Sequence, residues 1–416
     1  MESRGGVTVG SALKVEAGGS KLACPKCAHE FTPLARAAEG LSVAPIEDVS
    51  SDRLRALTME LMLIPGLSGH EGRVRRRLAA EMGRLSLAMA TDRLGNLIAT
   101  AQGDPSRPSV MLFAHMDQLG FVVRKIEASG FLRLERLGGV PERALAAQEL
   151  LICVGEGRDV RAVIGNKSHH ATSAEEKYRV LPYQEIVVDA GFSSAAAAAA
   201  AGVKIGSPVV YAPKAFALAE DRIAGTSVDD RAGCAVVMEV ARLLTPAQQR
   251  PTIHFVFSTQ EEHNLRGAMA AAHTLKPDIT IQLDLMLATD TPDMQSRGDL
   301  ALGGGPGMSL YSFHGRGTLN GTIPHPALVS LFESAARRTG LPLQRSAQVG
   351  VLTDSSYVQF VHGGVAAIDL GFPCRYTHSA LEMCDLSDLV GLASLLVAGI
   401  SSIEADFSLD RDDDLA

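Results

Sequence analysis

One stretch of sequence constrains the fold of this chain more than any other, because a strand pattern passes into a helix pattern through two adjacent carboxylates. Residues 252–258 form an apolar run typical of a buried parallel strand, and residues 265–272 have a helical pattern. Glu261 and Glu262 stand between them, at the strand's carboxyl end, where open α/β sheets bind ligands. Alone, such a pair is more often a solvated turn. In a metal-dependent active site, such a pair can serve with one carboxylate as a metal ligand and the other free to move a proton.

A second strand pattern, residues 109–114, delivers His115 and Asp117 at its end. A histidine that ligates a metal needs its other ring nitrogen held, and a carboxylate two residues later can do this. A buried histidine satisfied by a local hydrogen bond is the commoner explanation of this tripeptide taken alone. Amphipathic helices are predicted upstream, over residues 51–63 and 71–82.

Three more polar residues stand at similar positions. Asp229 opens a predicted helix, where an aspartate is usually only an N-cap. Asp284 ends the strand predicted for residues 278–283, and His378 follows the strand predicted for residues 365–371. Each residue has an ordinary structural explanation when it is considered separately.

As a set, these residues indicate a metal centre. Two histidines and three carboxylates are the ligands that a pair of borderline divalent ions requires. The set consists of His115, Asp229, Glu262, Asp284 and His378. If Asp229 bridges, each ion gains one histidine and one further carboxylate and keeps room for water. Glu261 remains beside a ligand, where a general base belongs.

Residues 119–216 differ in their sequence pattern from the α/β segments on either side. Their short apolar runs, separated by glycines and charged turns, predict a small barrel or sandwich. An alanine-rich helix is expected over residues 193–201. We therefore predict an α/β fold, in which residues 47–118 and 217–407 form a three-layer domain with a mixed, mostly parallel sheet. A small β-barrel domain is inserted between these two segments.

The first 46 residues are rich in glycine, serine and alanine and are expected to form a flexible extension. Cys24, Cys27 and His29 within it make half of a zinc-ribbon pattern, but the sequence contains no second Cys-x-x-Cys. The pattern favours a tail with two free thiols over a structural zinc knuckle completed by a ligand from elsewhere. The acidic residues 408–416 are predicted to be a disordered tail.

Composition argues against several classes of function. With a net charge of −8, the 416-residue chain is not expected to bind nucleic acid or an anionic membrane surface. It has no tryptophan and only 5% aromatic residues, so platforms for stacking bases or sugars are scarce. No apolar segment is long enough to span a bilayer, and the N-terminus lacks the apolar core of a secretory signal. A cytoplasmic protein without a disulfide framework is expected.

The motifs and their order resemble the M42 family of dinuclear metal aminopeptidases, which includes glutamyl aminopeptidase and the TET shell peptidases. The resemblance runs from about residue 57 to residue 400. It rests on residues 114–117, 229–234, 260–262, 265–268, 290–292 and 375–379. The family fold is a metallopeptidase domain with a β-barrel inserted after the His-x-Asp strand. This agrees with the change from α/β patterns to short strand patterns near residue 119.

The resemblance also implies a role for each polar residue of the set. One metal would be held by His115 and Asp284, the other by Glu262 and His378, and Asp229 would bridge them. Zn²⁺ is the expected metal, and Co²⁺ and Mn²⁺ accept the same ligands. Family members are built from dimers and often form tetrahedral shells of twelve subunits, so a homo-oligomer is expected.

The implied reaction is removal of the N-terminal residue from peptides by water that two metals activate. Glu261 would be the general base that takes the water's proton and returns it to the leaving amine. Asp117 would orient His115. The chain departs from the family pattern at Gln118, Leu119, Ser207, His263, Asn264 and Gly304. None of these is a predicted ligand, so the departures bear on substrate preference and assembly.

Three other functions remain as alternatives. An endoglucanase needs two carboxylates but usually no metal pair, and a chain without tryptophan lacks the usual surface for stacking sugars. A catalytically retired shell or binding protein should have lost a ligand or the base. A related metal hydrolase of N-acylated amino acids would keep the same residues, and a panel of substrates would separate it.

Overall fold

The computed structural model describes residues 22–23, 30–31, 48–247, 249–315 and 318–411. The chain divides into two compact units, Met1–Ile46 and Glu47–Ala416. In the first unit, β1 (Leu22–Ala23) pairs antiparallel with β2 (Glu30–Phe31). Cys24, Cys27 and His29 lie outside the described residues, as do the last five residues of the acidic tail.

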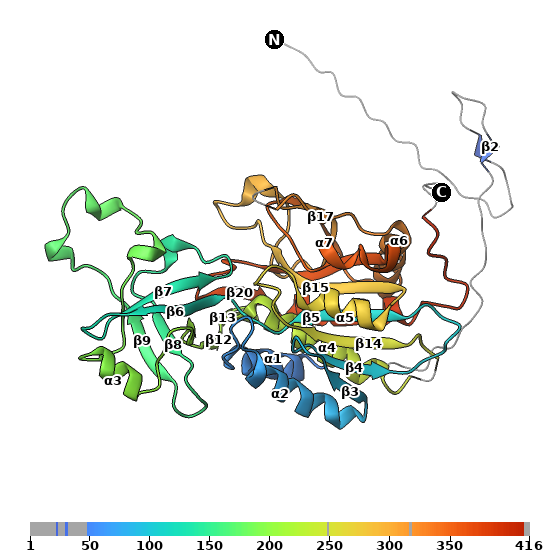
Figure 1. Ribbon diagram of the computed structural model, residues 1–416. Helices are drawn as coiled ribbons and strands as arrows, with labels where there is room; N and C mark the ends of the chain where they lie inside the picture. The colour runs from blue at the N-terminus through green and yellow to red at the C-terminus, as the bar shows by residue number, and fades with distance from the viewer. Residues whose placement is uncertain (1–21, 24–29, 32–47, 248, 316–317, 412–416) are drawn as a thin grey trace, which may run out of the picture. The chain divides into compact units, whose positions relative to one another are not determined.

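A mixed β-sheet forms the centre of the second unit (Figure 1). In spatial order its strands are β17 (Gly321–Thr322), β16 (Gly307–Phe313), β19 (Ala366–Cys374), β15 (Ile279–Leu287), β5 (Val110–His115), β14 (Ile253–Ser258), β4 (Leu97–Ala101) and β3 (Ala88–Thr91), with β18 (Gln344–Val349) also beside β16. The central strands β19, β15, β5 and β14 run parallel. The pairs β14–β4, β4–β3, β19–β16 and β16–β17 are antiparallel, and β18 pairs parallel with β16. The parallel strands are apolar and almost wholly buried because helices cover both faces.

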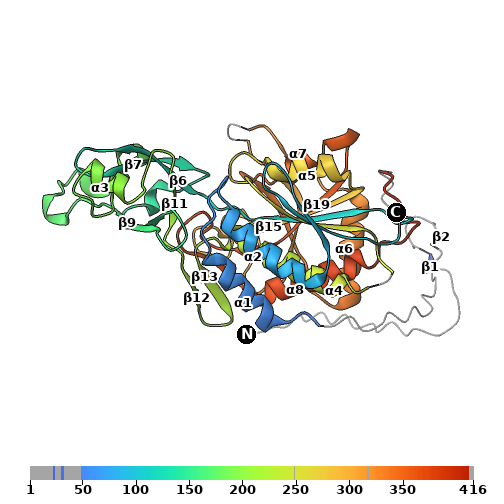
Figure 2. The same cartoon turned by 60° about the horizontal axis from the view of Figure 1, so that its bottom comes forward.

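Helices lie on both faces of this sheet (Figure 2). One face carries α1 (Ser51–Met62), α2 (Gly72–Met82), α4 (Val228–Leu244), α6 (Pro326–Thr339) and α8 (Leu386–Ile400), which share one apolar core with the sheet. The other face carries α5 (Gly267–Leu275) and α7 (Ser355–Val358) over a second core. The three-layer α/β fold is therefore confirmed.

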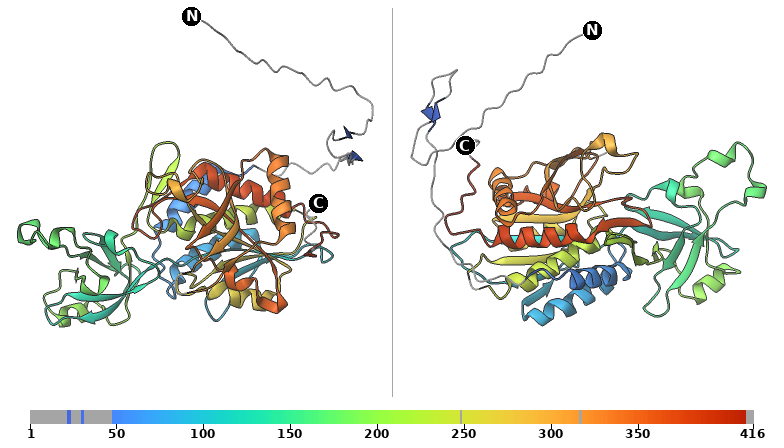
Figure 3. Two further views of the ribbon diagram at one scale, coloured as in Figure 1. Left: turned by 90° about the horizontal axis from the view of Figure 1, so that it is seen from above. Right: turned by 180° about the vertical axis from the view of Figure 1, so that it is seen from behind.

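A closed antiparallel barrel lies beside the sheet rather than on either face (Figure 3). Around the barrel the order is β10 (Val188–Asp189), β7 (Leu132–Leu137), β6 (Gly120–Ile126), β11 (Pro208–Tyr211), β8 (Glu149–Ile152) and β9 (Val160–Ile164). It has its own apolar core, in which Phe121 and Tyr211 meet edge to face with ring centroids 6.2 Å apart. The alanine-rich segment forms α3 (Ala195–Ala200), whose first turn is capped by the Ser194 hydroxyl. The predicted barrel is confirmed as a fold element, and the exact domain boundaries stay a prediction.

A small antiparallel sheet joins the segment after the barrel to the segment just before α8. It consists of β12 (Ala215–Ala217), β13 (Arg222–Gly225) and β20 (Glu382–Asp385). The short 3₁₀ helices are η1 (Gly83–Leu85), η2 (Glu142–Ala144), η3 (His169–Ala171), η4 (Glu176–Tyr178), η5 (Tyr183–Glu185), η6 (Gln295–Arg297) and η7 (Val361–Gly363). Within the described ranges, no helix is long and apolar enough to cross a membrane.

The prediction that Asp284 ends its strand is wrong, because β15 continues to Leu287. Pairing of β15 with β5 stops at Gln282, whereas pairing with β19 continues to the end of β15. Asp284 therefore lies where β15 diverges from β5. At this point β5 no longer pairs with β15, while the backbone of β15 is still hydrogen-bonded to β19 and holds Asp284 in place.

Candidate functional site

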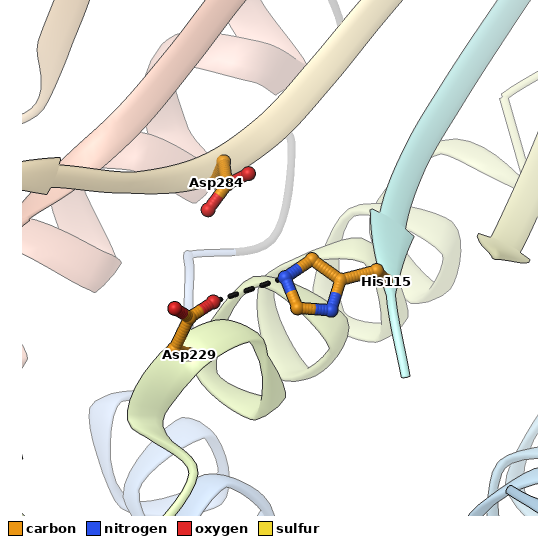
Figure 4. A group of neighbouring side chains, drawn as sticks. All are labelled: His115, Asp229 and Asp284. Atoms are coloured by element: carbon orange, nitrogen blue, oxygen red, sulfur yellow. Dashed lines mark hydrogen bonds and ion pairs between the residues drawn. The ribbon is translucent and has the colours of Figure 1, made fainter. Parts of the chain in front are cut away.

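Three predicted ligands converge where β5 and β15 separate (Figure 4). His115 is the last residue of β5, Asp229 is in the first turn of α4, and Asp284 lies within β15. Their ligand atoms all lie within 4.8 Å of one another, and His115 Nε2 is 2.9 Å from Asp229 Oδ1. His115 and Asp229 are buried and Asp284 is half-buried, so water screens the charges they bring together only weakly.

A second group shares Asp229 with the first. Asp229, Glu262 and His378 also have ligand atoms within 4.8 Å of one another. His378 Nε2 lies 3.4 Å from Asp229 Oδ2 and 3.9 Å from Glu262 Oε1. Asp229 thus directs one carboxylate oxygen to each group, which is the arrangement of a bridging ligand.

Both histidines present the same ring nitrogen to Asp229. His115 Nδ1 lies 3.1 Å from the main-chain oxygen of Asp117, and His378 Nδ1 lies 2.9 Å from the main-chain oxygen of Gly139. A carbonyl only accepts, so each Nδ1 carries the proton in the neutral ring and donates it there. This tautomer leaves a lone pair on each Nε2, which is the form that ligates a metal.

The loop after β7 of the barrel contributes to the site through Gly139. A Cβ on this residue would stand 2.8 Å from His378 Nδ1, so only glycine leaves room for the ring. The barrel therefore supplies both the acceptor for His378 and the space that the ring occupies.

Asp117 contacts the site in a different way from the one expected. Its carboxylate accepts the backbone N–H of Glu261 at 3.0 Å and that of Glu262 at 3.1 Å. Its Oδ1 is 3.5 Å from His115 Nδ1, farther than its own main-chain oxygen. Asp117 thus fixes the turn that carries the two glutamates, and its orienting role toward His115 stays a prediction.

Burial dominates the electrostatics of the acidic residues. It raises the pKa of Glu261 and of Asp284 well above their ordinary values, and it raises the pKa of Glu262 to about 7. Asp229 is the exception: burial acts to raise its pKa, but hydrogen bonds with His115 and His378 lower it below its ordinary value. Without a cation, these carboxylates are costly to ionise together.

The donor set fits divalent metal ions. Imidazole nitrogens and carboxylate oxygens at this spacing suit zinc-like ions, and cations would relieve the repulsion among the buried acids. Glu262 Oε1 is buried and has no hydrogen-bond partner among the described residues. An unpartnered buried carboxylate oxygen that points at a histidine is an available ligand atom.

The two groups face a cleft of about 540 Å³. Glu261, Glu262, Asp284 and His378 line it together with Gly139 of the barrel loop. Its other walls are largely apolar or uncharged and include Leu285, Leu287, Val351, Leu352, Asn264 and Thr318. A cleft of this volume is large enough to hold a small organic ligand.

Sequence reasoning missed three residues that support the site. Gln282 Nε2 donates to Asp284 Oδ2 at 3.2 Å, Gly139 accepts from His378, and Glu382 accepts backbone N–H groups from two of the ligands. Glu382 stands four residues after His378, which was the one local signal available. Which groups these side chains and carbonyls reach depends on strand register and loop path, which no local pattern reveals.

The family model and the relatives of 30% identity or more show the family of this chain. A family model described as M42 glutamyl aminopeptidase matches residues 95–395. The Escherichia coli (strain K12) protein SgcX is 35% identical over 347 residues, which cover 83% of this chain and 93% of SgcX. The lysyl aminopeptidase of Pyrococcus furiosus is 31% identical over 352 residues, covering 84% of this chain and 97% of the relative.

Solved structures show the same likeness. An aminopeptidase from the archaeon Desulfurococcus kamchatkensis superposes with a TM-score of 0.80 at 29% identity, covering 86% of this chain and 97% of that one. The TET1 peptidase of Pyrococcus horikoshii, which can assemble into a tetrahedron or a large octahedral shell, has a TM-score of 0.74 at 28% identity, covering 84% and 99% of the two chains.

Proposed function

The chain belongs to the M42 family and is a peptide hydrolase, and from this premise we propose that it is an aminopeptidase with two divalent metal ions at its active site. The observation that carries the proposal is the shared carboxylate of Asp229, which directs one oxygen to each of two ligand groups. A single buried site would not need a second histidine on the far side of the same aspartate.

In this proposal, His115 and Asp284 hold one ion, Glu262 and His378 hold the other, and Asp229 bridges. When bound, the two ions supply Lewis-acid polarisation of the scissile carbonyl and activation of water. The main-chain carbonyls of Asp117 and Gly139 keep both histidines in the ligating tautomer. Zn²⁺ is the expected ion, since its preferred donors are these ones.

Glu261 is the proposed general base. Its side chain lines the cleft beside Glu262, and Asp117 holds its backbone N–H. Because burial raises the pKa of Glu261, its carboxylate is basic enough to take a proton from the attacking water. The same proton then goes to the amine as the C–N bond breaks, and Glu261 returns to its ionised state.

The cleft favours peptides with a free N-terminus over the alternative substrates. An N-acylated amino acid carries a carboxylate that needs a cation, and among the described residues that line the cleft there is no lysine or arginine. A retired enzyme would have lost a ligand or the base, whereas all six of these residues are present and close together. An endoglucanase would not need the paired histidines.

We also propose that the chain forms a homo-oligomer. The TET1 peptidase of Pyrococcus horikoshii can assemble into a tetrahedron or a large octahedral shell, and nearly all of its chain is matched here. The barrel has its own core and an outer surface apart from the peptidase sheet, which leaves that surface available for a dimer contact.

The experiment that tests the proposed function uses aminoacyl-nitroanilides with the chelated protein, before and after Zn²⁺, Co²⁺ or Mn²⁺ is added. The same compounds with an acetylated amine serve as the control. Activity restored by metal on free but not on acetylated compounds is the expected result. Activity on N-acylated amino acids alone, or none with two ions bound per chain, would refute an aminopeptidase.

A further inference from the structure

Glu382 contacts the main chains of two proposed ligands and belongs to neither ligand group. It is the first residue of β20 and its side chain is 2% exposed. Its Oε2 accepts the backbone N–H of Asp229 at 3.0 Å, and its Oε1 accepts the backbone N–H of His378 at 2.7 Å. One carboxylate thus ties together the main chains of two ligands that lie far apart in the sequence.

The position of Glu382 follows from the register of the small sheet. β20 pairs antiparallel with β13, which places Glu382 opposite Gly225. The chain then runs from Gly225 through a short turn to Asp229 at the start of α4. On the other side, His378 lies four residues before Glu382. Both ligands are therefore within reach of one side chain at the edge of this sheet.

The backbone around both ligands needs such support. Ser227, two residues before Asp229, has a φ of 60°, and His378 itself has a φ of 66°. Residues other than glycine rarely adopt this left-handed conformation, and it persists only where the surroundings hold it. Hydrogen bonds to a carboxylate are stronger than those between neutral groups, so Glu382 is well suited to hold it.

We propose that Glu382 is a positioning residue that fixes Asp229 and His378 in the geometry that binds the second metal ion. This inference rests on the proposed two-metal function. Asp229 belongs to both groups, whereas His378 belongs only to the second, so loss of Glu382 affects the second ion more than the first. Other residues fix the remaining ligands: Asp117 holds Glu262, and Gln282 contacts Asp284.

The test is Glu382→Gln, which keeps the size of the side chain and replaces one acceptor oxygen by an NH₂ group. An NH₂ group cannot accept, so one of the two backbone N–H groups loses its partner. Asp388→Asn is the matched control. Asp388 is also buried, and its two oxygens accept the backbone N–H groups of Gly303 and Gly305 at 2.8 and 2.7 Å, outside both ligand groups.

The readout is titration of the chelated full-length proteins with Co²⁺, followed by visible absorption, with circular dichroism as the check on folding. The wild-type protein and Asp388→Asn should bind two ions alike. Glu382→Gln should bind the second ion about 10- to 100-fold more weakly and the first with a smaller change. Two ions bound with wild-type affinity by Glu382→Gln, or an equal loss in Asp388→Asn, would overturn the assignment.

The proposal and the proposed function fail in different ways. Fewer than two ions bound by the wild-type protein refutes the two-metal function itself. If Glu382→Gln does not fold, Glu382→Asp is titrated in its place, and its shorter side chain should weaken the second ion as well. If Glu382→Asp binds both ions with wild-type affinity, the inference is overturned. If both Glu382 variants fail to fold while Asp388→Asn folds, Glu382 serves fold stability alone, and the inference is overturned as well.

Discussion

The backbone N–H of Glu261 donates to Oδ1 of Asp117 at 3.0 Å, and the next N–H, that of Glu262, donates to Oδ2. A single carboxylate at the end of β5 therefore sets the direction in which the turn after β14 leaves the sheet. The proposed base and a proposed ligand are neighbours in sequence, but their side chains have different tasks. Because Asp117 holds both backbone N–H groups, the turn is fixed, and the side chains of Glu261 and Glu262 keep their different directions.

Glu261→Gln should fold and bind metal as the wild-type protein does, because it keeps the side chain's size and leaves the ligand groups intact. Without the base, turnover should fall by about 10²–10⁴-fold. The measurement is kcat on the best aminoacyl-nitroanilide, together with the metal content of the dialysed variant. Turnover close to that of the wild type would remove Glu261 from its assigned role.

Gly139→Ala should weaken the site from the side of the barrel. The new Cβ would lie 2.8 Å from His378 Nδ1, so the ring has to move and its bond to the main-chain oxygen of residue 139 is strained. We expect binding of the second ion to weaken by about 10-fold or more. Gly72→Ala is the control, since its Cβ meets only the side-chain ends of two arginines at ordinary contact distances. Equal metal binding by the two variants would contradict the prediction.

The chelated protein should become less stable as pH rises from about 5 to about 8. Burial raises the pKa of both Glu262 and Asp354 to about 7, from ordinary values of 4.5 and 3.8. In this window the unfolded chain has released protons that the folded chain still binds, so the free energy of unfolding falls as pH rises. Urea unfolding at pH 5.5 and pH 8 measures this. A midpoint that is higher at pH 8 would show that these acids are ionised in the folded, metal-free state.

Gln118→Glu should stabilise the protein. Arg231 is fully buried and donates to Gln118 Oε1 at 3.2 Å, while its Nε and Nη1 have no hydrogen-bond partner in the described part of the chain. Burial lowers the pKa of Arg231 to about 10, which reflects the cost of this charge. A carboxylate at residue 118 would pair with it, and we expect a gain of about 1–3 kcal/mol in the free energy of unfolding. Gln118→Leu should instead destabilise, and urea unfolding of the two variants distinguishes them.

Local patterns predicted the elements that carry most of the candidate site. β5 and β14 are apolar on both faces because they are central parallel strands, and such runs are recognisable without any tertiary information. His115 and Glu262 could be placed from them because His115 ends β5 and Glu262 lies in the turn just after β14. The end of β15 was misplaced because the apolar pattern weakens at Asp284, while pairing with β19 carries the strand onward.

The parts that escaped prediction depend on contacts between distant segments. No element was predicted for the region of α6 and the strands β16 to β18, although α6 buries Leu328, Leu331, Phe332 and Ala335 at helical spacing. Gly139 and Glu382 act through a main-chain oxygen and through a carboxylate whose partners lie on other elements. Their roles follow from the register of β20 on β13 and from the path of the loop after β7, which are set only when the sheets pack.

The hydrogen bond from His378 Nδ1 to the main-chain oxygen of Gly139 joins the segment between β19 and β20 to the loop after β7 of the barrel. A rigid-body rotation of the barrel would displace this acceptor and turn the imidazole with it. Motion of the barrel would thus reach the group formed by Asp229, Glu262 and His378, and any contact that restrains the barrel also restrains the orientation of the His378 ring.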